Sequence, residues 1–438
     1  MLSSSVDAPS PATGLEVRPF RALTYRQHDP GHLARVSSPA YDLVTPADRD
    51  DLAAADPHNI VRLILPRVDP DPPNGDRSAG VGTAEQAGET LRRWESEAVL
   101  VRDPEPALWL YEMQPEGVFG ATRGWLGAVT LPGPGSRAVL PHEDTYPPAV
   151  EGRRALLAAT RTDLEPIVLA HDPEPALAEW GARVRRADPD AEVTDADGVR
   201  HRLWRVTDPG VLREVTAALH RTGAVIADGH HRFAAAMAHH RERPDGLGSD
   251  AVLALVTPMG ASGLRVEAIH RVVPELPLEE ALSAAARGFR VEERPVAGGR
   301  DELLRAIADW LSGDEDPGFL LTDGRRLVRL HDPSAEVLAT VPAESPAAWR
   351  GLDVVVAQHG LITALWQRRD DPASVMVAHD VDEALENAAA REGVALLLRA
   401  PSPTDVAAVA RAGARMPRKS TLFVPKPRTG LVLRPHDA

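Results

Sequence analysis

The 438-residue sequence contains no cysteine. Disulfide bonds, thiolate zinc sites, iron–sulfur clusters and cysteine nucleophiles are therefore excluded. Long apolar runs are also missing, because the longest blocks, such as AVLALV at 251–256, have only the length of a strand. A membrane-spanning helix needs a much longer run, so we expect no membrane partner. The N-terminus has neither a basic start nor an apolar signal segment, and this predicts a cytoplasmic protein.

Positive charge is scarce as well. The chain has 49 basic and 64 acidic residues, and its formal net charge is −15. This balance repels phosphate backbones, so we expect no nucleic-acid partner. The 43% of apolar residues and 26% of charged residues are ordinary for a folded globular chain. The composition therefore indicates a soluble, folded chain.

Lysine is the rarest basic residue. Only Lys419 and Lys426 occur, and both lie in MPRKSTLFVPKPRTG near the C-terminus. Arginine and lysine are not chemically interchangeable, and a compact ammonium group beside Ser420 and Thr421 suits a phosphate or a carboxylate. We therefore predict that Lys419, Ser420 and Thr421 bind a cofactor, although the Gly-rich stretch of a P-loop is missing. The alternative is that the lysines only brace a closing hairpin.

The alternation of apolar and polar residues predicts a mixed α/β (α+β) fold. Residues 201–243 read as strand, helix, strand, tight turn and helix, with Asp208 and Pro209 starting the first helix. Further strands are expected at 59–66, 251–259 and 264–273, a hairpin at 107–132, and helices after Thr45 and over 83–99. The expected domains are a disordered tail at 1–14, an N-terminal α/β domain at 15–275 and a C-terminal α+β domain at 276–438.

The strongest local feature is IADGHHRFAAA at 226–236. A strand that turns directly into a helix directs the unpaired N–H groups of that helix at an anion, and phosphate is the natural ligand. Gly229 allows close approach of the backbone, Arg232 offers a planar fork, and His230 and His231 add donors or a proton shuttle. Asp228 could hold magnesium or accept a proton. The structural alternative is an Asp-Gly turn before an alanine-rich core helix.

The second feature is HEDT at 142–145, which lies before a helix that carries Arg153 and Arg154. A histidine with adjacent carboxylates, here His142 and Glu143, can form a general base or part of a metal shell. A loop of solvated charges is the alternative.

Two smaller candidates complete the set. Tyr41 and Asp42 stand in a loop that leaves the N-terminal region. His270 and Arg271 lie in an apolar strand, where such a pair is more often structural than catalytic.

Seven ordered motifs resemble those of the domain-of-unknown-function 1015 family. They are PFRAL at 19–23, PAYD at 39–42, HEDT at 142–145, ADGHHRFAAA at 227–236, IHRVV at 269–273, LDVVVAQH at 352–359 and MPRKSTLFVPKPRTGLV at 416–432. Ala40 departs from the pattern, since the family usually has a second proline before Tyr-Asp. The family name implies no function.

The turn at 226–236 is also similar to the phosphate-binding turn of the ParB and sulfiredoxin superfamily, which includes free-serine kinases. This resemblance implies a ParB/sulfiredoxin-like core and a nucleotide-dependent phosphotransferase for a small hydroxylated metabolite, with ATP or ADP and Mg²⁺ as cofactors. Gly229, His230 and Arg232 would then bind phosphates. The implied catalytic residues are Asp228, His231, Glu143 and His142, and the implied metal ligands are Asp228 and Glu143.

Other functions stay open at this stage. A nucleotide-sensing or scaffold protein could use the same turn to bind nucleotide without turnover. A metal-dependent hydrolase could be built from His142, Glu143, His230 and His231. A ParB-like DNA-binding role is disfavoured by the net charge and by the lack of a helix-turn-helix motif with a basic face. The sequence leaves the oligomeric state unknown.

Overall fold

The computed structural model describes residues 14–67, 82–117, 120–260, 263–296, 298–313, 317–371 and 373–436. The chain divides into two compact units, unit 1 with Met1–Leu264 and Pro425–Ala438, and unit 2 with Arg265–Val424. The boundary therefore differs from the expected one near residue 275, and the end of the expected C-terminal domain returns to unit 1. The expected disordered tail at 1–14 lies outside the described residues except for Gly14.

Unit 1 is built on a nine-stranded mixed sheet, which confirms the mixed α/β class. The order is β6-β11-β8-β12-β5-β4-β10-β9, with β1 beside β5. The strands are β1 (Val17–Arg18), β4 (Leu108–Gln114), β5 (Thr122–Thr130), β6 (Val139–Leu140), β8 (Ile167–His171), β9 (Ala191–Thr194), β10 (Arg200–Val206), β11 (Ala224–Asp228) and β12 (Ala251–Pro258). Only β11 with β6 and β12 with β8 pair in parallel.

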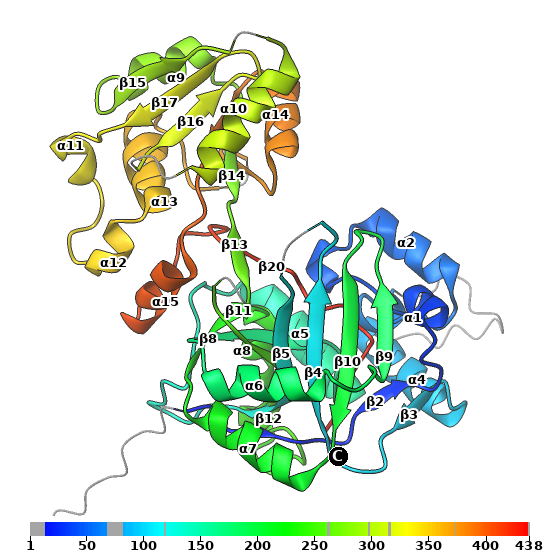
Figure 1. The fold of residues 1–438 in the computed structure, drawn as a ribbon. Helices are drawn as coiled ribbons and strands as arrows, with labels where there is room; N and C mark the ends of the chain where they lie inside the picture. The colour runs from blue at the N-terminus through cyan, green and yellow to red at the C-terminus, as the bar shows by residue number, and fades with distance from the viewer. Residues whose placement is uncertain are drawn as a thin grey trace, which may run out of the picture. The chain divides into compact units, whose positions relative to one another are not determined.

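Helices pack against this sheet. They are α1 (Pro30–Val36), α2 (Pro46–Ala55), α3 (Val61–Ile64), α4 (Thr83–Ser96), α5 (Pro147–Thr160), α6 (Pro175–Val184), α7 (Pro209–His220) and α8 (His230–Glu242). Figure 1 shows α6 and α7 together on one face of the sheet, and α5 packs against both α4 and α8. Two short ladders, β2 (Leu23–Tyr25) with β3 (Leu100–Arg102) and β7 (Thr162–Asp163) with β21 (Arg434–Pro435), lie beside the main sheet.

Local chemistry starts these helices where the sequence predicts. The Asp208 side chain accepts the Val211 N–H at 2.9 Å, and Pro209 follows as the first residue of α7. Thr45 forms a capping box with Asp48 at the start of α2. The predicted hairpin is also confirmed, because β4 and β5 pair antiparallel.

Two sequence predictions are wrong in detail. The expected strand at 59–66 is the helix α3, because the Asn59 side chain accepts the Val61 N–H at 2.9 Å and turns the chain. Its apolar residues are buried on all sides, a pattern that suits a buried helix as well as a strand. The expected strand at 264–273 is two strands, β13 (Arg265–Glu267) and β14 (His270–Val273), in different sheets.

Unit 2 contains a six-stranded antiparallel sheet in the order β15-β17-β16-β19-β14-β18. These strands are β15 (Arg290–Arg294), β16 (Phe319–Thr322), β17 (Leu327–His331), β18 (Met376–Ala378) and β19 (Val394–Leu397), with β14. β13 pairs separately with β20 (Leu422–Val424). The helices are α9 (Leu278–Ala285), α10 (Arg300–Ser312), α11 (Ala335–Leu338), α12 (Ala347–Arg350), α13 (Asp353–Val356), a π-helix (Ala357–Leu365), α14 (Val381–Ala390) and α15 (Pro403–Arg411).

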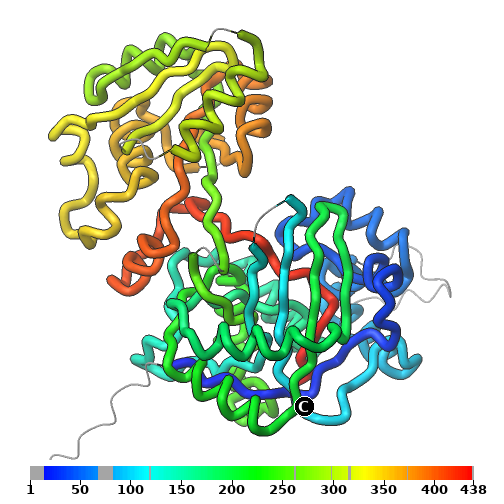
Figure 2. Tube along the Cα trace, viewed as in Figure 1, coloured from blue at the N-terminus to red at the C-terminus, as the bar shows by residue number. Residues whose placement is uncertain are grey.

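The C-terminal segment of unit 1, from Pro425 onward, runs beside the N-terminal residues of the chain (red against blue and cyan in Figure 2). Leu23 and Leu433 exchange two backbone hydrogen bonds of 3.0 Å each, and β21 pairs with β7. The ends of the sequence are thereby held in one unit. Within the described residues, no helix is both long and apolar enough to cross a bilayer.

A buried ion pair fixes the end of this segment. Arg434 donates to Asp163 at 2.7 Å, and His436 lies 3.4 Å from the other carboxylate oxygen. Burial raises the pKa of Asp163. The charge of Arg434 and the hydrogen bond and charge of His436 together have a larger effect, so the pKa lies well below its usual range. The pair therefore stabilises the fold above the pKa of an unfolded aspartate, and this contribution is lost as the pH falls through the folded value.

We predict that Arg434→Leu destabilises the protein by roughly 3–5 kcal/mol at neutral pH, because it leaves a buried carboxylate without its cation. The loss should shrink as the pH falls below about 4, the range in which an unfolded aspartate is protonated. Chemical denaturation across this pH range measures it. The control is Arg18→Leu, which breaks the exposed pair with Asp250 and should cost at most about 1 kcal/mol. Equal losses for both variants would contradict the interpretation.

Candidate functional site

The turn from β11 to α8 has the predicted order of strand, glycine and helix. Gly229 has a φ of +92° and precedes the first helical residue, His230. A Cβ atom at Gly229 would lie 2.8 Å from Cγ2 of Ile167, so both the backbone angle and the space require glycine. The turn thus brings the start of α8 directly to the end of β11, which lies between the edge strand β6 and β8.

Asp228, the last residue of β11, binds two cations. One carboxylate oxygen accepts from Arg232, one turn along α8, and the other lies 2.8 Å from Nζ of Lys426. Burial raises the pKa of Asp228, but Arg232 and Lys426 outweigh it and hold the pKa below its usual range. The carboxylate is therefore ionised at neutral pH.

Lys426 lies between two carboxylates. Its Nζ is 2.5 Å from Asp42 as well as 2.8 Å from Asp228, and only 9% of its side chain is exposed. Burial lowers the pKa of Lys426, but the two carboxylates raise it above its usual value. Ser38 and Thr429 exchange two backbone hydrogen bonds of 3.1 and 2.8 Å, which align the PAYD loop with the C-terminal segment.

A second group of charges supports Tyr41, the neighbour of Asp42. The Glu165 Oε1 atom accepts the Tyr41 N–H at 3.0 Å and the Thr429 hydroxyl at 3.0 Å. The Arg153 guanidinium lies 3.9 Å from the centre of the Tyr41 ring, and that of Arg232 lies 5.6 Å away. Three cations and three carboxylates therefore form one charge cluster: Arg153, Arg232 and Lys426 with Asp42, Glu165 and Asp228.

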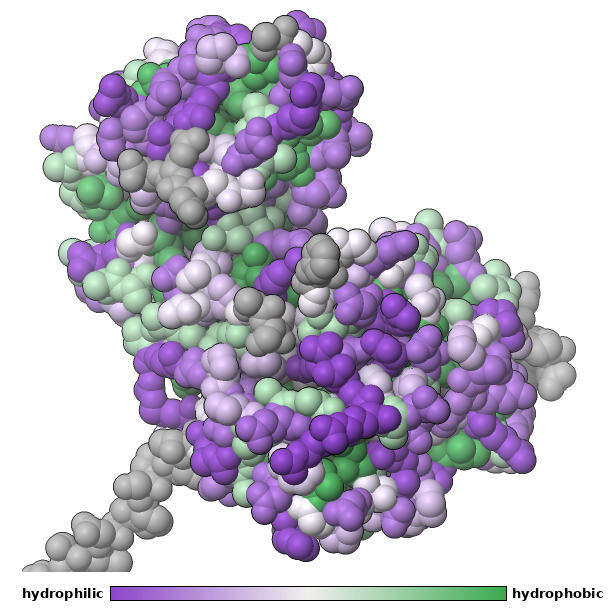
Figure 3. Space-filling model, viewed as in Figure 1, coloured by the Kyte–Doolittle hydropathy of each residue, from purple (hydrophilic) through white to green (hydrophobic). Residues whose placement is uncertain are grey.

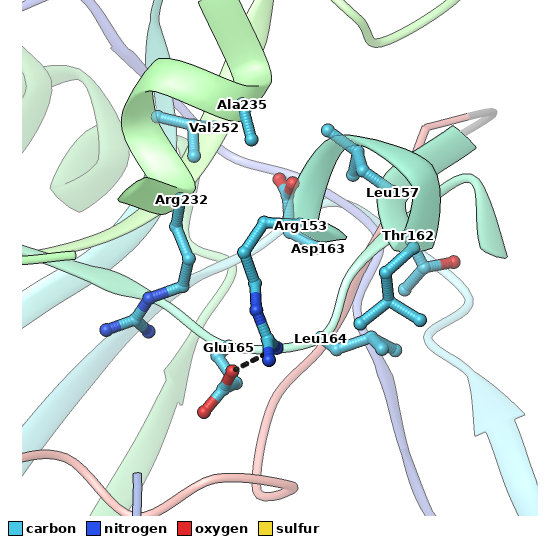
Figure 4. A pocket seen from close by; sticks show the side chains of 10 residues that line it. Arg153, Leu157, Thr162, Asp163, Leu164, Glu165, Arg232, Ala235 and Val252 are labelled. Atoms are coloured by element: carbon cyan, nitrogen blue, oxygen red, sulfur yellow. Dashed lines mark ion pairs between the residues drawn. The ribbon is translucent and has the colours of Figure 1, made fainter. Parts of the chain in front are cut away.

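A small cavity adjoins this charge cluster. Its walls include Arg153, Glu165 and Arg232, and Figure 4 shows the Arg153 side chain extending to Glu165. Its volume is about 50 Å³, which is space for one or two water molecules. A nucleotide needs several times this volume. This cavity is therefore too small to hold a nucleotide.

The HEDT loop meets the start of α8 through backbone contacts. Nε2 of His230 accepts the N–H groups of His142 and Glu143 at 3.2 and 3.3 Å, and the His142 and His230 rings are 4.6 Å apart. Nε2 of His231 accepts the Tyr146 N–H at 3.1 Å. His142 and His230 are buried, whereas Glu143 and His231 are partly exposed. The two sequence motifs are thus brought together.

The structure does not favour the predicted magnesium ligands in this arrangement. Both oxygens of Asp228 face cations, and the described residues contain no group of three or more histidine, aspartate or glutamate side chains placed to hold a metal. The pair Asp228 and Glu143 as metal ligands stays a prediction, and so does the hydrolase built from His142, Glu143, His230 and His231.

The remaining sequence candidates lie in unit 2. Lys419 is exposed, Ser420 is buried and donates its hydroxyl to the Pro417 carbonyl at 2.6 Å, and Thr421 follows them. Their assignment to a cofactor stays a prediction. Arg271 is buried and donates to backbone carbonyls, among them that of Arg418 at 3.0 Å, as expected for a structural residue.

Sequence reasoning missed part of the charge cluster. Lys426 belongs to the cluster, and the scarcity of lysine was the signal that could have assigned it. Glu165 carries no such signal, because LEPIVL reads as an ordinary entry to a strand. The Arg232 guanidinium, which the sequence predicts as a phosphate fork, pairs with Asp228, and 11% of its side chain is exposed. Its binding of phosphate stays a prediction.

The chain belongs to the family described as "Protein of unknown function (DUF1015)", whose model matches residues 17–355. Similar solved structures include a conserved hypothetical protein from Pyrococcus furiosus, with 13% identity, TM-score 0.31, and coverage of 66% of this chain and 87% of that chain. SbnI with C-terminal truncation from Staphylococcus aureus has 14% identity, TM-score 0.36, and coverage of 70% and 85%. A free serine kinase in complex with AMP has 14% identity, TM-score 0.31, and coverage of 67% and 89%. No curated protein matches the sequence. The structural similarity is distant.

We predict that Arg232→Ala lowers the free energy of unfolding by roughly 3 kcal/mol, the low end of the cost of breaking a buried ion pair, because Lys426 still neutralises Asp228. Urea denaturation measures this loss. The matched control is Arg154→Ala on α5, whose partners Glu151 and Glu242 are exposed, and this variant should denature close to the wild-type midpoint. A wild-type midpoint for Arg232→Ala would show that the residue is not structural.

Proposed function

We propose that this protein is a nucleotide-dependent phosphotransferase, with ATP or ADP as donor and a small hydroxylated metabolite as acceptor. The observation that supports it is the convergence of motifs far apart in sequence on the 228–232 turn. Asp42 and Lys426 reach Asp228 through ion pairs, and the HEDT loop reaches His230 through backbone hydrogen bonds. We infer that this turn is the phosphate-binding turn of a ParB/sulfiredoxin-like core.

Phosphate binding requires a change in the charge cluster, because its three cations and three carboxylates are balanced. Asp42 is the carboxylate best placed to leave. Its side chain is 33% exposed, against 13% for Asp228, and it comes from a short surface 3-10 helix, Tyr41–Leu43. In this proposal a phosphate oxygen takes the place of Asp42 on the Lys426 ammonium, at the end where α8 presents its positive dipole.

The chemical step joins an acceptor oxygen to the terminal phosphorus and breaks the bond from that phosphorus to the bridging oxygen of the nucleotide. The hydroxyl proton passes to the protein, and we assign its acceptance to Glu143 or His231, because both are partly exposed at the turn. Lys426 and Gly229 stabilise and position the phosphoryl group. His142 and His230 are buried, and we assign them to positioning the loop.

A second candidate is a nucleotide-binding protein without turnover. One observation favours it. Burial raises the pKa of Asp228, but the charges of Arg232 and Lys426 have the larger effect and hold the pKa below its usual range. A carboxylate with so low a pKa is a weak general base, so the ionised carboxylate at the turn itself does not serve the proton transfer, and only Glu143 and His231 are left for that role. The two candidates share the binding site and differ in whether nucleotide is consumed.

We predict that Lys426→Met weakens nucleotide binding about tenfold or more and removes phosphoryl transfer, because it deletes the ammonium that binds the phosphate. Isothermal titration with ADP or ATP measures binding. Phosphorus NMR with nucleotide, magnesium and serine as first acceptor measures transfer. Unchanged affinity in Lys426→Met would overturn the proposed site. Tight binding with no new phosphorus signal for any acceptor would favour the second candidate.

Two further variants separate loss of function from loss of fold. Lys426→Arg keeps the charge and should keep a folded protein with reduced transfer, because a guanidinium is not equivalent to an ammonium. Arg221→Met removes an exposed pair with Glu174 in the same unit, and this control should bind nucleotide like the wild type. Thermal melting of each variant checks that it is folded.

A further inference from the structure

A second cavity in unit 1 lies between α6 and the sheet, and it shares no lining residue with the cavity at the 228–232 turn. Its volume is about 200 Å³, larger than the apolar cavity of about 150 Å³ that binds benzene in an engineered protein. Its apolar wall includes Leu110, Trp125, Leu177 and Val256, all buried. The body of the cavity therefore suits a flat or branched hydrocarbon group.

Two arginines stand at one end of this cavity. Arg123 comes from β5 and Arg185 follows the last residue of α6. Their side chains are 35% and 31% exposed, so this end of the cavity opens to solvent. Figure 3 shows hydrophilic residues gathered over β4, β5 and β10 beside α6. The cavity thus combines an apolar interior with a cationic entrance.

The positive charge around Arg123 and Arg185 exceeds the negative charge, and Glu174, a carboxylate on the lining of the same cavity, is paired with Arg221 at 2.8 Å. Glu112, which is fully buried on β4, lies in register between Arg123 on β5 and Arg202 on β10 and pairs with both. Arg185 lies 3.6 Å from the same carboxylate. In the described part of the chain, Glu112 is the only carboxylate paired with Arg123 or Arg185. One carboxylate thus pairs with three guanidinium groups. A second carboxylate, Glu192 on β9, lies opposite Arg202 in the sheet.

Of the three arginines, Arg185 has the longest ion pair with Glu112. Its pair with Glu112 is longer than a hydrogen bond, and its Nε atom is buried without a hydrogen-bond partner. Burial lowers the pKa of Arg185, and repulsion by Arg123 lowers it further against the attraction of Glu112. A buried donor without an acceptor is costly. An added anion could therefore pair with the Arg185 guanidinium and accept a hydrogen bond from its Nε atom.

We propose that this cavity binds a small carboxylate with an apolar body, such as an aromatic or branched-chain acid. The carboxylate would lie between Arg185 and Arg123, and the apolar body would rest against Trp125 and Leu177. Carboxylate is favoured because its two oxygens match the fork of a guanidinium. The site is separate from the proposed nucleotide site, so it can act as an effector site of the same unit.

Fluorine NMR with 4-fluorobenzoate as the probe tests this proposal. We expect the wild-type protein to broaden the probe signal at millimolar concentration, and Arg185→Gln to weaken binding about tenfold. The neutral 4-fluorobenzyl alcohol should bind more weakly than the acid. Arg183→Gln is the matched control on α6, because Arg183 stacks on Trp180 and does not line the cavity, and it should bind like the wild type.

A second variant blocks the cavity without removing a charge. A Cβ atom at Gly181 would contact only Cδ1 of Leu110, at 3.6 Å, so a larger side chain can enter the cavity from α6. Gly181→Leu should abolish probe binding and leave the melting temperature at or above the wild-type value, because leucine favours a helix more than glycine does. No binding by the wild type, equal binding of acid and alcohol, or undiminished binding by both variants would each overturn the proposal.

Discussion

The Lys426 ammonium group between Asp42 and Asp228 is the interaction on which the site depends. It joins a loop near the N-terminus, the end of β11 and the C-terminal segment at one point. Buried charges are costly unless they are paired. Lys426 therefore pairs with both carboxylates, and Arg232 on α8 is the second cation that pairs with Asp228. These ion pairs join segments of unit 1 that are far apart in the sequence.

The same constraint limits the possible functions. A balanced charge cluster does not attract an anion at long range, so an anionic ligand must exchange with one of the carboxylates. Asp42 is more exposed than Asp228 and lies on a short surface element, which makes it the partner that can exchange. A phosphate group can make that exchange because it offers the ammonium equivalent oxygens and also meets the N-terminus of α8. The proposed function follows from this exchange.

Sequence reasoning succeeded where the relevant chemistry is local. Asp208 and Pro209 start α7, Thr45 starts α2, and the strand, glycine and helix around Gly229 occur as predicted, because caps and turns are set by neighbouring residues. It failed at 59–66, where a run that is buried on all sides suits either a helix or a strand. It also missed the pairing of Lys426 with Asp42, which depends on the return of the C-terminal segment to unit 1. Nothing in the local pattern of MPRKSTLFVPKPRTG indicates that return.

The scarcity of lysine permits a direct test of the central claim. Protein labelled with isotope-enriched lysine contains only two side-chain ammonium groups, those of Lys419 and Lys426, and the spectrum of Lys419→Arg assigns them. The account predicts that the Lys426 signal is protected from solvent exchange without ligand, and that it shifts when ADP or ATP is added. A Lys426 signal that stays unchanged at saturating nucleotide would contradict the account.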